Sequence, residues 1–274
     1  MTREKVAEPI LRWAGSKRKL LPLLVQASPK TFHRYAEPFV GSGVLFLKLG
    51  TENALLGDLN ADLIDTYKTV REHPRAVWNR VVGMSQSPEF YYDLRGVTPS
   101  SLKPLDRAAR FVYLNRFCFN GVYRTNRSGQ FNVPRGNGKL SIPDFSVFKA
   151  FASRLKNAEL ACADFETIVR LTKNGDFLYL DPPYALGEKR DRGEYGAGSF
   201  RESDEDRLIS CIASASARGV KVLLSYSPSD KVKEKLANWN FYNLSVSRSV
   251  AGFADQRRKA EEILVSNYKW KIDD

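Results

Sequence analysis

The sequence predicts an α/β fold with a mostly helical insertion, and three observations support this prediction. Segments with strand character alternate with helical segments near both ends of the 274-residue chain. A glycine turn, Gly41-Ser42-Gly43, lies between one such strand and a helix, as in nucleotide-type βα units. From residue 66 to residue 143 the alternation stops. We therefore expect residues 1–65 and 144–274 to form one α/β domain, with residues 66–143 inserted as a second unit.

Composition limits the class of protein further. Hydrophobic residues make up 43% of the chain, which favours an ordered core, and no apolar run approaches the length of a membrane span. No secretory signal is visible at the start, so we expect a cytoplasmic protein. The cysteines have no metal-binding spacing and are expected to be small buried hydrophobes: Cys118, Cys162 and Cys211. With only His33 and His73 as histidines we expect no metal, although carboxylates alone can hold one.

Charge points to a polyanionic partner. The chain has 43 Lys and Arg against 31 Asp and Glu, a net charge of +12. No acidic residue occurs between Arg107 and Pro143, and this stretch includes Arg107, Arg110, Arg116, Arg124, Arg127, Arg135 and Lys139. Aromatic and amide side chains are interleaved with these charges and could stack on bases or bind their edges. A solvated basic face is the alternative, and we favour nucleic-acid binding over it.

Two segments in the first half of the chain end in polar residues that could bind a ligand with a ribose or an anionic group. Residues 10–17 end in a turn, and the helix that follows has apolar positions at 20, 21, 24 and 25. A ligand could bind at the start of this helix. Alternatively, Ser16 could simply cap the helix. A strand at residues 35–37 precedes the glycine turn and a helix over residues 44–49. The next strand, residues 54–58, ends in Asp58. Asp58 could accept hydrogen bonds from a ribose diol, or cap the helix with the apolar stripe Leu59, Leu63, Tyr67 and Val70.

The α/β alternation returns after residue 143. We expect a helix through residues 147–155, a strand over residues 159–162 that leads to Asp164-Phe165, and a further strand over residues 221–226. Residues 187–198 form a glycine-rich loop that either covers the site or is a passive surface loop. Ser203 with Asp206 resembles a capping box, and Gly219 ends the helix that follows. Residues 241–246 and 263–268 are expected to form a final strand pair.

The segment Asp181-Pro182-Pro183-Tyr184 follows a buried strand over residues 177–180. The prolines end the strand and stiffen the backbone at its carboxyl end, where open α/β sheets bind their ligands. A carboxylate, rigid carbonyls and an aromatic face can together hold a flat ring that bears an amine. An ordinary turn after a strand is the alternative.

Taken together, these residues resemble the Dam-type, or D12 class, DNA adenine-N6 methyltransferases. The matching segments occur in the order found in the family and span nearly the whole chain: 13–17, 37–43, 57–60, 120–126, 131–134, 181–184 and 267–268. Ser16 departs from the family, which usually has a second glycine there. The resemblance implies a Rossmann-like fold that binds S-adenosylmethionine, an insertion that recognises double-stranded DNA, and a prokaryotic or phage-infected cell as the location. Family members commonly methylate adenine within GATC, so GATC is the expected target; the oligomeric state stays open, and a monomer is compatible with the sequence.

The resemblance also implies roles for individual residues. Asp181, Pro182, Pro183 and Tyr184 would form the catalytic segment, in which Tyr184 stacks on a flipped adenine and Asp181 accepts from its amine. The residues expected at the cofactor are Trp13, Lys17, Glu37, Phe39, Gly41, Ser42, Gly43, Asp58, Asp164, Phe165 and Asp181. Those expected at DNA are Arg116, Asn120, Tyr123, Arg124, Asn126, Arg127, Asn132, Pro134 and Arg135.

Two other functions compete with this interpretation. Asn-Pro-Pro-Tyr would suit glutamine methylation and Ser-Pro-Pro-Tyr would suit cytosine-N4 methylation, so Asp181 and the basic insertion favour adenine in DNA, with RNA left open. The second alternative is a DNA-binding protein that has kept the fold and lost catalysis. The presence of Asp181, Tyr184, Asp58 and Lys17 argues against it.

Overall fold

A seven-stranded mixed sheet forms the centre of the protein. The computed structural model describes residues 7–126, 128–137, 140–183, 200, 202–247 and 259–271. The strand order is β3-β2-β1-β4-β5-β7-β6. The first five of these strands are parallel, and β7 pairs antiparallel with both β5 and β6. The strands are β1 (Tyr35–Glu37), β2 (Ala54–Asp58), β3 (Ala158–Cys162), β4 (Phe177–Leu180), β5 (Lys221–Tyr226), β6 (Asn240–Ser247) and β7 (Lys259–Ser266).

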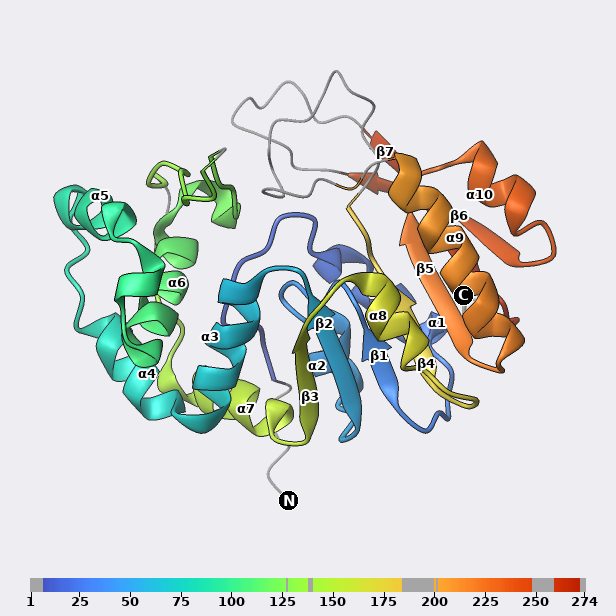
Figure 1. The fold of residues 1–274 in the computed structure, drawn as a ribbon, viewed down its shortest axis with the longest axis horizontal. Coiled ribbons are helices and arrows are strands. Elements are labelled where there is room, and N and C mark those ends of the chain that lie inside the picture. Colours follow the sequence, from blue (N-terminus) through green and yellow to red (C-terminus); the bar gives the residue numbers. More distant parts are fainter. Residues whose placement is uncertain are drawn as a thin grey trace.

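Helices cover both faces of this sheet. Figure 1 shows α8 and α9 in front of the strands, α1 and α2 behind them, and α4 to α6 beyond the edge of the sheet. The α-helices are α1 (Leu21–Ala27), α2 (Val44–Leu49), α3 (Ala61–Glu72), α4 (Pro74–Val82), α5 (Pro88–Gly96), α6 (Pro104–Phe117), α7 (Phe145–Leu155), α8 (Phe165–Arg170), α9 (Glu202–Ala217) and α10 (Asp230–Lys235). Short 3₁₀ turns are η1 (Lys17–Leu20), η2 (Pro99–Ser101) and η3 (Phe119–Gly121). None of the helices described is both long and apolar enough to cross a membrane.

Local sequence explains where many helices begin. Helices α4, α5 and α6 each start at a proline, whose fixed φ suits the first turn and whose missing N–H would lack a partner there anyway. Asn60 accepts a hydrogen bond from the amide of Leu63 and caps α3. Ser229 does the same for α10 through the amide of Val232. These caps satisfy backbone donors that the helices themselves leave unpaired.

The two faces of the sheet bury separate hydrophobic cores. Side chains alternate along each strand, so neighbouring residues face opposite cores. One core contains the strand residues Tyr35, Leu56, Phe177, Tyr179 and Leu223, and packs against α2, α3, α6 and α7. The other contains Ala36, Leu55, Leu178, Leu180 and Val222, and packs against α8 and α9. The sheet is therefore covered on both sides, as expected for largely parallel strands.

Most of the expected elements are present, and the α/β fold class is confirmed. The strands at residues 35–37, 54–58, 177–180 and 221–226 and the helix at residues 44–49 have the expected bounds. The final strand pair is also present, as β6 and β7. Strand β7 begins four residues earlier than expected and ends at Ser266, so the expected end at residue 268 is wrong. The expected insertion boundary at residue 66 falls inside α3. The glycine-rich loop at residues 187–198 lies outside the described residues.

Four details of the sequence interpretation are wrong. Helix α9 begins at Glu202, so Ser203 lies inside its first turn and is not the cap. Leu59 precedes α3 and is 59% exposed, so it does not belong to the apolar stripe of that helix. Cys162 is exposed at the end of β3 rather than buried. Helix α10 was not expected, because its sequence is mostly charged and its only buried residue is Val232.

Asn267 joins three elements at the end of β7. Its side-chain oxygen accepts from the amide of Val222 at 2.8 Å, and its amide nitrogen donates to Ser216 Oγ and to the carbonyl of Val220, each at 2.8 Å. The side chain therefore replaces backbone partners where β5, α9 and β7 meet.

We expect Asn267→Ala to lower the free energy of unfolding by about 2 kcal/mol, since it removes three hydrogen bonds and leaves partly buried backbone groups unpaired. Denaturant unfolding followed by circular dichroism measures the change. Asn243→Ala, at an exposed position on β6, is the control and should change stability little. Equal effects of the two substitutions would contradict the role of Asn267.

Candidate active site

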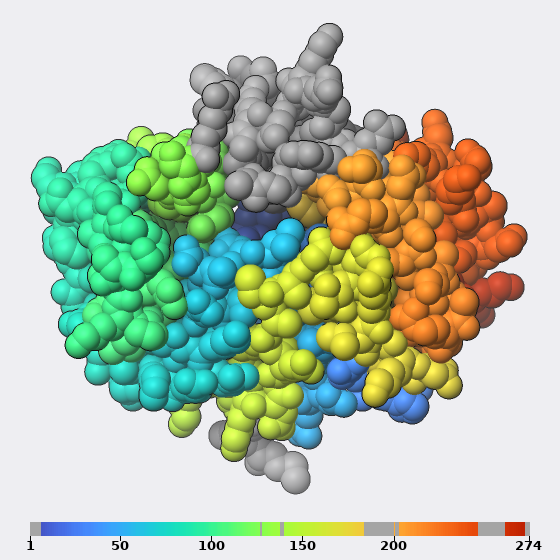
Figure 2. All heavy atoms as spheres, viewed as in Figure 1, coloured from blue at the N-terminus to red at the C-terminus, as the bar shows by residue number. Residues whose placement is uncertain are grey.

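A cavity of about 720 Å³ opens at the carboxyl ends of β1, β2 and β4. The strand order reverses between β1 and β4, and such a switch point is where open α/β sheets bind ligands. Figure 2 shows a hollow in this region, between the green residues of the chain after α6, the blue residues near β2 and α3, and the yellow residues of α8. All eleven residues expected at the cofactor line the cavity, as do Pro182 and Pro183. Tyr184 lies outside the described residues.

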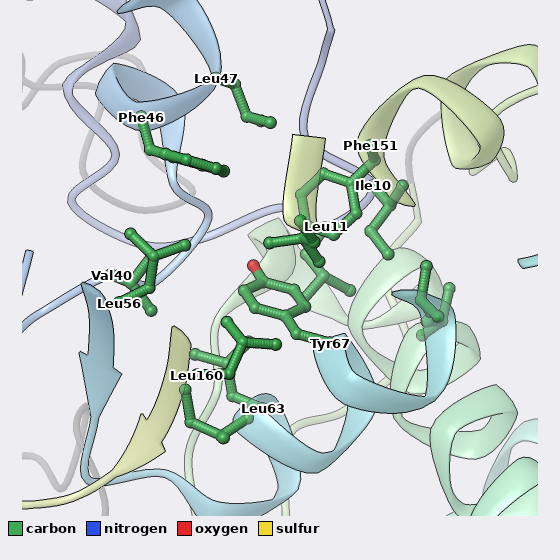
Figure 3. Close-up of a cluster of buried hydrophobic side chains, with 14 of the residues drawn as sticks. Ile10, Leu11, Val40, Phe46, Leu47, Leu56, Leu63, Tyr67, Phe151 and Leu160 are labelled. Carbon is green, nitrogen blue, oxygen red and sulfur yellow. The ribbon is translucent and has the colours of Figure 1, made fainter. Parts of the chain in front are cut away.

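The glycine turn after β1 brings the backbone close to an aromatic ring. Gly41 has φ of +44°, and a Cβ at this position would lie 2.7 Å from Trp13 Cδ1. Only glycine fits this conformation beside the indole. The hydroxyl of Tyr67 donates to the Gly41 carbonyl at 2.5 Å. Figure 3 shows the ring of Tyr67 packed among the apolar side chains of Leu63, Leu11 and their neighbours. Trp13 and Tyr67 therefore hold the glycine turn between them.

Asp58 is held by backbone amides at the end of β2. Its Oδ2 accepts from the amide of Gly41 at 3.1 Å, and its Oδ1 accepts from the amide of Asn60 at 2.9 Å. The expectation that Asp58 could cap α3 is wrong, because Asn60 is the cap. Burial raises the pKa of Asp58 to about 6, although the two amides act in the opposite direction. A carboxylate in this position can accept hydrogen bonds from a diol when it is ionised.

Lys17 and Asp181 form an ion pair inside the cavity. Lys17 Nζ lies 2.8 Å from Asp181 Oδ1, and the lysine side chain is only 7% exposed. Glu262 on β7 contributes a second carboxylate, with its Oε2 at 3.9 Å from the same ammonium. The pair joins the turn before α1 to the segment after β4. Lys17 also holds the Asp181 carboxylate in one orientation. A carboxylate held in this way can accept hydrogen bonds from a ligand in a defined geometry.

Glu37 adds another acidic group at the base of the cavity. It is 3% exposed, and its Oε2 accepts from the hydroxyl of Tyr35 at 2.9 Å. Burial raises its pKa well above the usual value, the Tyr35 hydrogen bond lowers it, and the nearby charges of Asp181 and Asp58 raise it further. With Glu37, Asp58, Asp181 and Glu262 near one Lys17, the region has an excess of acidic groups. Such a cavity suits a ligand that bears positive charge.

Aromatic rings form the far wall of the cavity. Phe39 stacks on Phe165 with ring centroids 5.5 Å apart and planes at 27°, and Phe200 meets both rings at 6.3 and 6.1 Å. Asp164 caps α8 by accepting from the amide of Glu166 at 2.9 Å. An aromatic wall beside a carboxylate can hold a flat heterocycle with an exocyclic amine. The cavity therefore offers a wall for a ring, an acceptor for a diol and acidic groups for a cation.

A hairpin of residues 117–136 lies above the cavity, and we name it the recognition hairpin. Antiparallel bridges join Cys118 to Arg135 and Thr125 to Phe131. Asn126 accepts from the amides of Ser128 and Gln130 at 3.0 and 2.9 Å, so its side chain shapes the turn of the hairpin.

The residues expected at DNA differ in where their side chains lie on the recognition hairpin. Arg124 Nε donates to Asn132 Oδ1 at 2.8 Å. Asn120 and Pro134 are exposed. Tyr123 instead turns toward the cavity, which it lines, and stacks on Trp13 at 6.0 Å and 14°. Arg127 lies outside the described residues.

The basic residues between positions 107 and 135 divide into two groups. Arg107 pairs with Asp65 at 3.1 Å, and Arg110 is 5% exposed and donates to backbone carbonyls, so these two are structural. Arg135 donates to the Gln86 carbonyl at 2.9 Å and so also helps to hold the hairpin. In Arg116, burial together with the charges of Arg12 and Arg18 lowers the pKa to about 10. A bound anion would stabilise the charged form of Arg116 against this burial and repulsion.

Three residues of the site were not expected from the sequence. Glu262 is a charged residue in an otherwise buried strand. A charge in such a strand needs a partner, so the sequence could have indicated that Glu262 belongs to the site. Tyr67 was interpreted as apolar because its position in α3 faces the core, but its hydroxyl binds Gly41. Phe200 had no local signal. Within the parts of the chain that the structure describes, no group of three or more His, Cys, Asp or Glu could hold a metal ion.

Known proteins of similar sequence match most of the chain. The chain is 33% identical to the "Type II methyltransferase M1.LlaDCHI" of Lactococcus lactis subsp. cremoris, covering 95% of each protein. It is 32% identical to the "Type II methyltransferase M.MjaIII" of Methanocaldococcus jannaschii, covering 95% of this chain and 99% of that one. It is 31% identical to a "DNA adenine methylase" of Escherichia coli strain K12, covering 93% of each.

The family model described as "D12 class N6 adenine-specific DNA methyltransferase" matches residues 13–250. This span runs from Trp13 in the cavity through the recognition hairpin and Asp181 into the chain after β6. It therefore includes the glycine turn, Asp58, the hairpin and the Asp-Pro-Pro-Tyr segment in one match. The chain belongs to the family of D12 class N6 adenine-specific DNA methyltransferases.

Proposed function

We propose that the protein methylates N6 of an adenine that is flipped out of double-stranded DNA, with GATC as the target sequence. The observation that supports this most directly is the Lys17–Asp181 pair at 2.8 Å, inside an acidic cavity next to the recognition hairpin. A base within a duplex cannot reach such a cavity, so flipping is part of the proposal. GATC is the target expected from the resemblance described above.

The residues around the cavity fit S-adenosylmethionine, which supplies the methyl group on a positively charged sulfur. Asp58, fixed between two amides, would accept from the ribose hydroxyls. Phe39 and Phe165 would contact the adenine ring, with Asp164 beside them. Glu37 and the acidic groups near Lys17 would favour the cationic end of the molecule.

Asp181 would accept a hydrogen bond from the N6 amine of the target adenine, and the carbonyl of Pro182 would accept a second. Two acceptors orient the nitrogen lone pair toward the methyl group and stabilise the positive charge that develops on nitrogen. Lys17 keeps the Asp181 carboxylate in one orientation before the adenine arrives. Tyr184, which follows Pro183, is proposed to stack on the flipped base.

The recognition hairpin would read the DNA. Arg124, held by Asn132, is the proposed base-reading side chain, since a positioned guanidinium can bind a base edge in the major groove. Asn120 and Pro134 are exposed on the same hairpin. Arg116 would bind a phosphate, because an anion would offset the burial and the repulsion from Arg12 and Arg18 that lower its pKa.

Asp181→Ala should reduce methyl transfer to adenine by about 100- to 1000-fold, since one of the two acceptors for the amine is lost. Cofactor binding should stay measurable, because Glu262 still faces Lys17 at 3.9 Å and keeps its charge compensated. Transfer of a labelled methyl group to DNA and calorimetric binding of the cofactor measure the two effects.

The control for this experiment is Asp230→Ala, at an exposed position on α10 that does not line the cavity. This substitution should leave transfer unchanged. Undiminished methylation by the Asp181 variant would overturn its assigned role.

Cofactor affinity should fall as the pH drops below about 6, the value to which burial raises the pKa of Asp58. An acid with a raised pKa is protonated below that value and then accepts hydrogen bonds from the diol less well. The dissociation constant should rise by about tenfold for each pH unit below the pKa.

Asp58→Asn separates this effect from that of Glu37, whose pKa is also raised. The part of the pH dependence that disappears in the variant belongs to Asp58. A variant that keeps the whole pH dependence of the wild type would contradict the assignment.

Arg124→Ala should relax sequence choice by about 1–3 kcal/mol at one position of the target. Methylation of DNAs with GATC and with single substitutions in it gives the preference. We propose that Arg127 binds a phosphate instead, so Arg127→Ala should weaken methylation of all these DNAs alike. Equal loss on every DNA for Arg124→Ala would remove this residue from base reading.

A further inference from the structure

Arg207, in the second turn of α9, connects this helix to the aromatic wall of the cavity. Its Nη2 donates to Asp164 Oδ1 at 2.7 Å, its Nη2 and Nε contact Glu166 Oε2 at 3.0 and 3.2 Å, and its Nη1 contacts Asp204 at 2.8 Å. Its guanidinium carbon also lies 4.8 Å from the centre of the Phe165 ring. One side chain therefore contacts three carboxylates and an aromatic ring, and Asp164, Phe165 and Asp204 all line the cavity.

The contacts of Asp164 determine which of its oxygens is available. Oδ1 accepts from the Glu166 amide at 2.9 Å and from Arg207 at 2.7 Å. Among the residues that the structure describes, Oδ2 has no hydrogen-bond partner and can accept from a ligand. By fixing Oδ1, Arg207 fixes the rotation of the carboxylate and so the direction in which Oδ2 faces.

Helix α8 needs such support from outside. It spans only Phe165–Arg170, and a helix of six residues is not stable by itself. Phe165, its first residue, faces the cavity, so movement of this turn would move the aromatic wall. Arg207 also lowers the pKa of Glu166, and the three carboxylates raise the pKa of Arg207, so the network favours its charged form.

We propose that Arg207 is a positioning residue for the adenosine end of the cofactor, which it orders through Asp164 and Phe165 without contributing to methyl transfer. This inference rests on the proposed function, in which Asp164 and Phe165 meet the adenine. Arg207 itself is 41% exposed, so each of its ion pairs is individually weak, and their combination with the ring contact is what matters.

The test compares the dissociation constants of two ligands, S-adenosylhomocysteine and 5′-methylthioadenosine, which lacks the amino-acid part. Arg207→Ala should raise both constants by about tenfold, because the defect lies at the adenosine end that the two ligands share. The KM for S-adenosylmethionine should rise by a similar factor, while kcat at saturating cofactor and DNA stays within about twofold. Arg207→Lys, which cannot bridge the same carboxylates, should show an intermediate defect.

Arg170→Ala is the matched control. Arg170 is 74% exposed and pairs with the same Glu166, but with its other oxygen, Oε1, and it has no contact with Asp164 or Phe165 among the described residues. This variant should bind both ligands like the wild type. If Arg207→Ala does not fold by circular dichroism, Arg207→Lys provides the same comparison.

Three results would overturn the role of Arg207: unchanged dissociation constants, equal defects in the Arg207 and Arg170 variants, or a fall in kcat without a rise in KM. A defect confined to S-adenosylhomocysteine would also overturn it, because 5′-methylthioadenosine contains the whole adenosine end. Failure of the proposed cofactor site gives a different result, since the wild-type protein would then bind neither ligand, whereas a different methyl acceptor would leave both ligands bound and change only the transfer assay.

Discussion

The buried ion pair between Lys17 and Asp181 is the interaction on which the site depends. It joins the turn before α1 to the segment after β4, at the point where the strand order reverses. A buried ammonium without a carboxylate would be strongly destabilising, so Asp181 stabilises the packing of the N-terminal segment at this point. Glu262 on β7 extends the same constraint to a third segment. Lys17 thus joins three segments of the chain at the site.

The other acidic groups of the cavity work against stability. Burial raises the pKa of Glu37 and Asp58 above their values in an unfolded chain, so ionising them opposes folding as the pH rises through those values. The fold tolerates this because Tyr35, Gly41 and Asn60 donate hydrogen bonds to the two carboxylates. A cationic cofactor would compensate the remaining charge. The buried carboxylates therefore lower the stability of the fold and would raise its affinity for a cationic ligand. Groups with shifted pKa values are common in binding sites for this reason.

The sequence predicted the residues that follow parallel strands better than those that reach the cavity from elsewhere. Asp58, Asp164 and Asp181 could be found because the carboxyl ends of parallel strands converge at one edge of the sheet. Tyr67 could not, since its partner Gly41 lies 26 positions earlier and only the tertiary fold brings the two together. The start of α9 was misplaced for a similar reason, because a local capping pattern does not show where packing begins the helix.

The acid-free stretch after Arg107 shows why net charge alone overstates a DNA-binding surface. Arg107 and Arg110 belong to the acid-free stretch, yet both are used inside the protein, by Asp65 and by the carbonyls of Leu94 and Arg95. Fewer basic side chains of this stretch than the sequence suggests are therefore open to a DNA partner. Tyr123 of the recognition hairpin stacks on Trp13, which in turn packs against the glycine turn. The segment proposed to read DNA therefore also forms part of the cavity wall, so a shift of the hairpin on DNA would act directly on the packing around the cofactor.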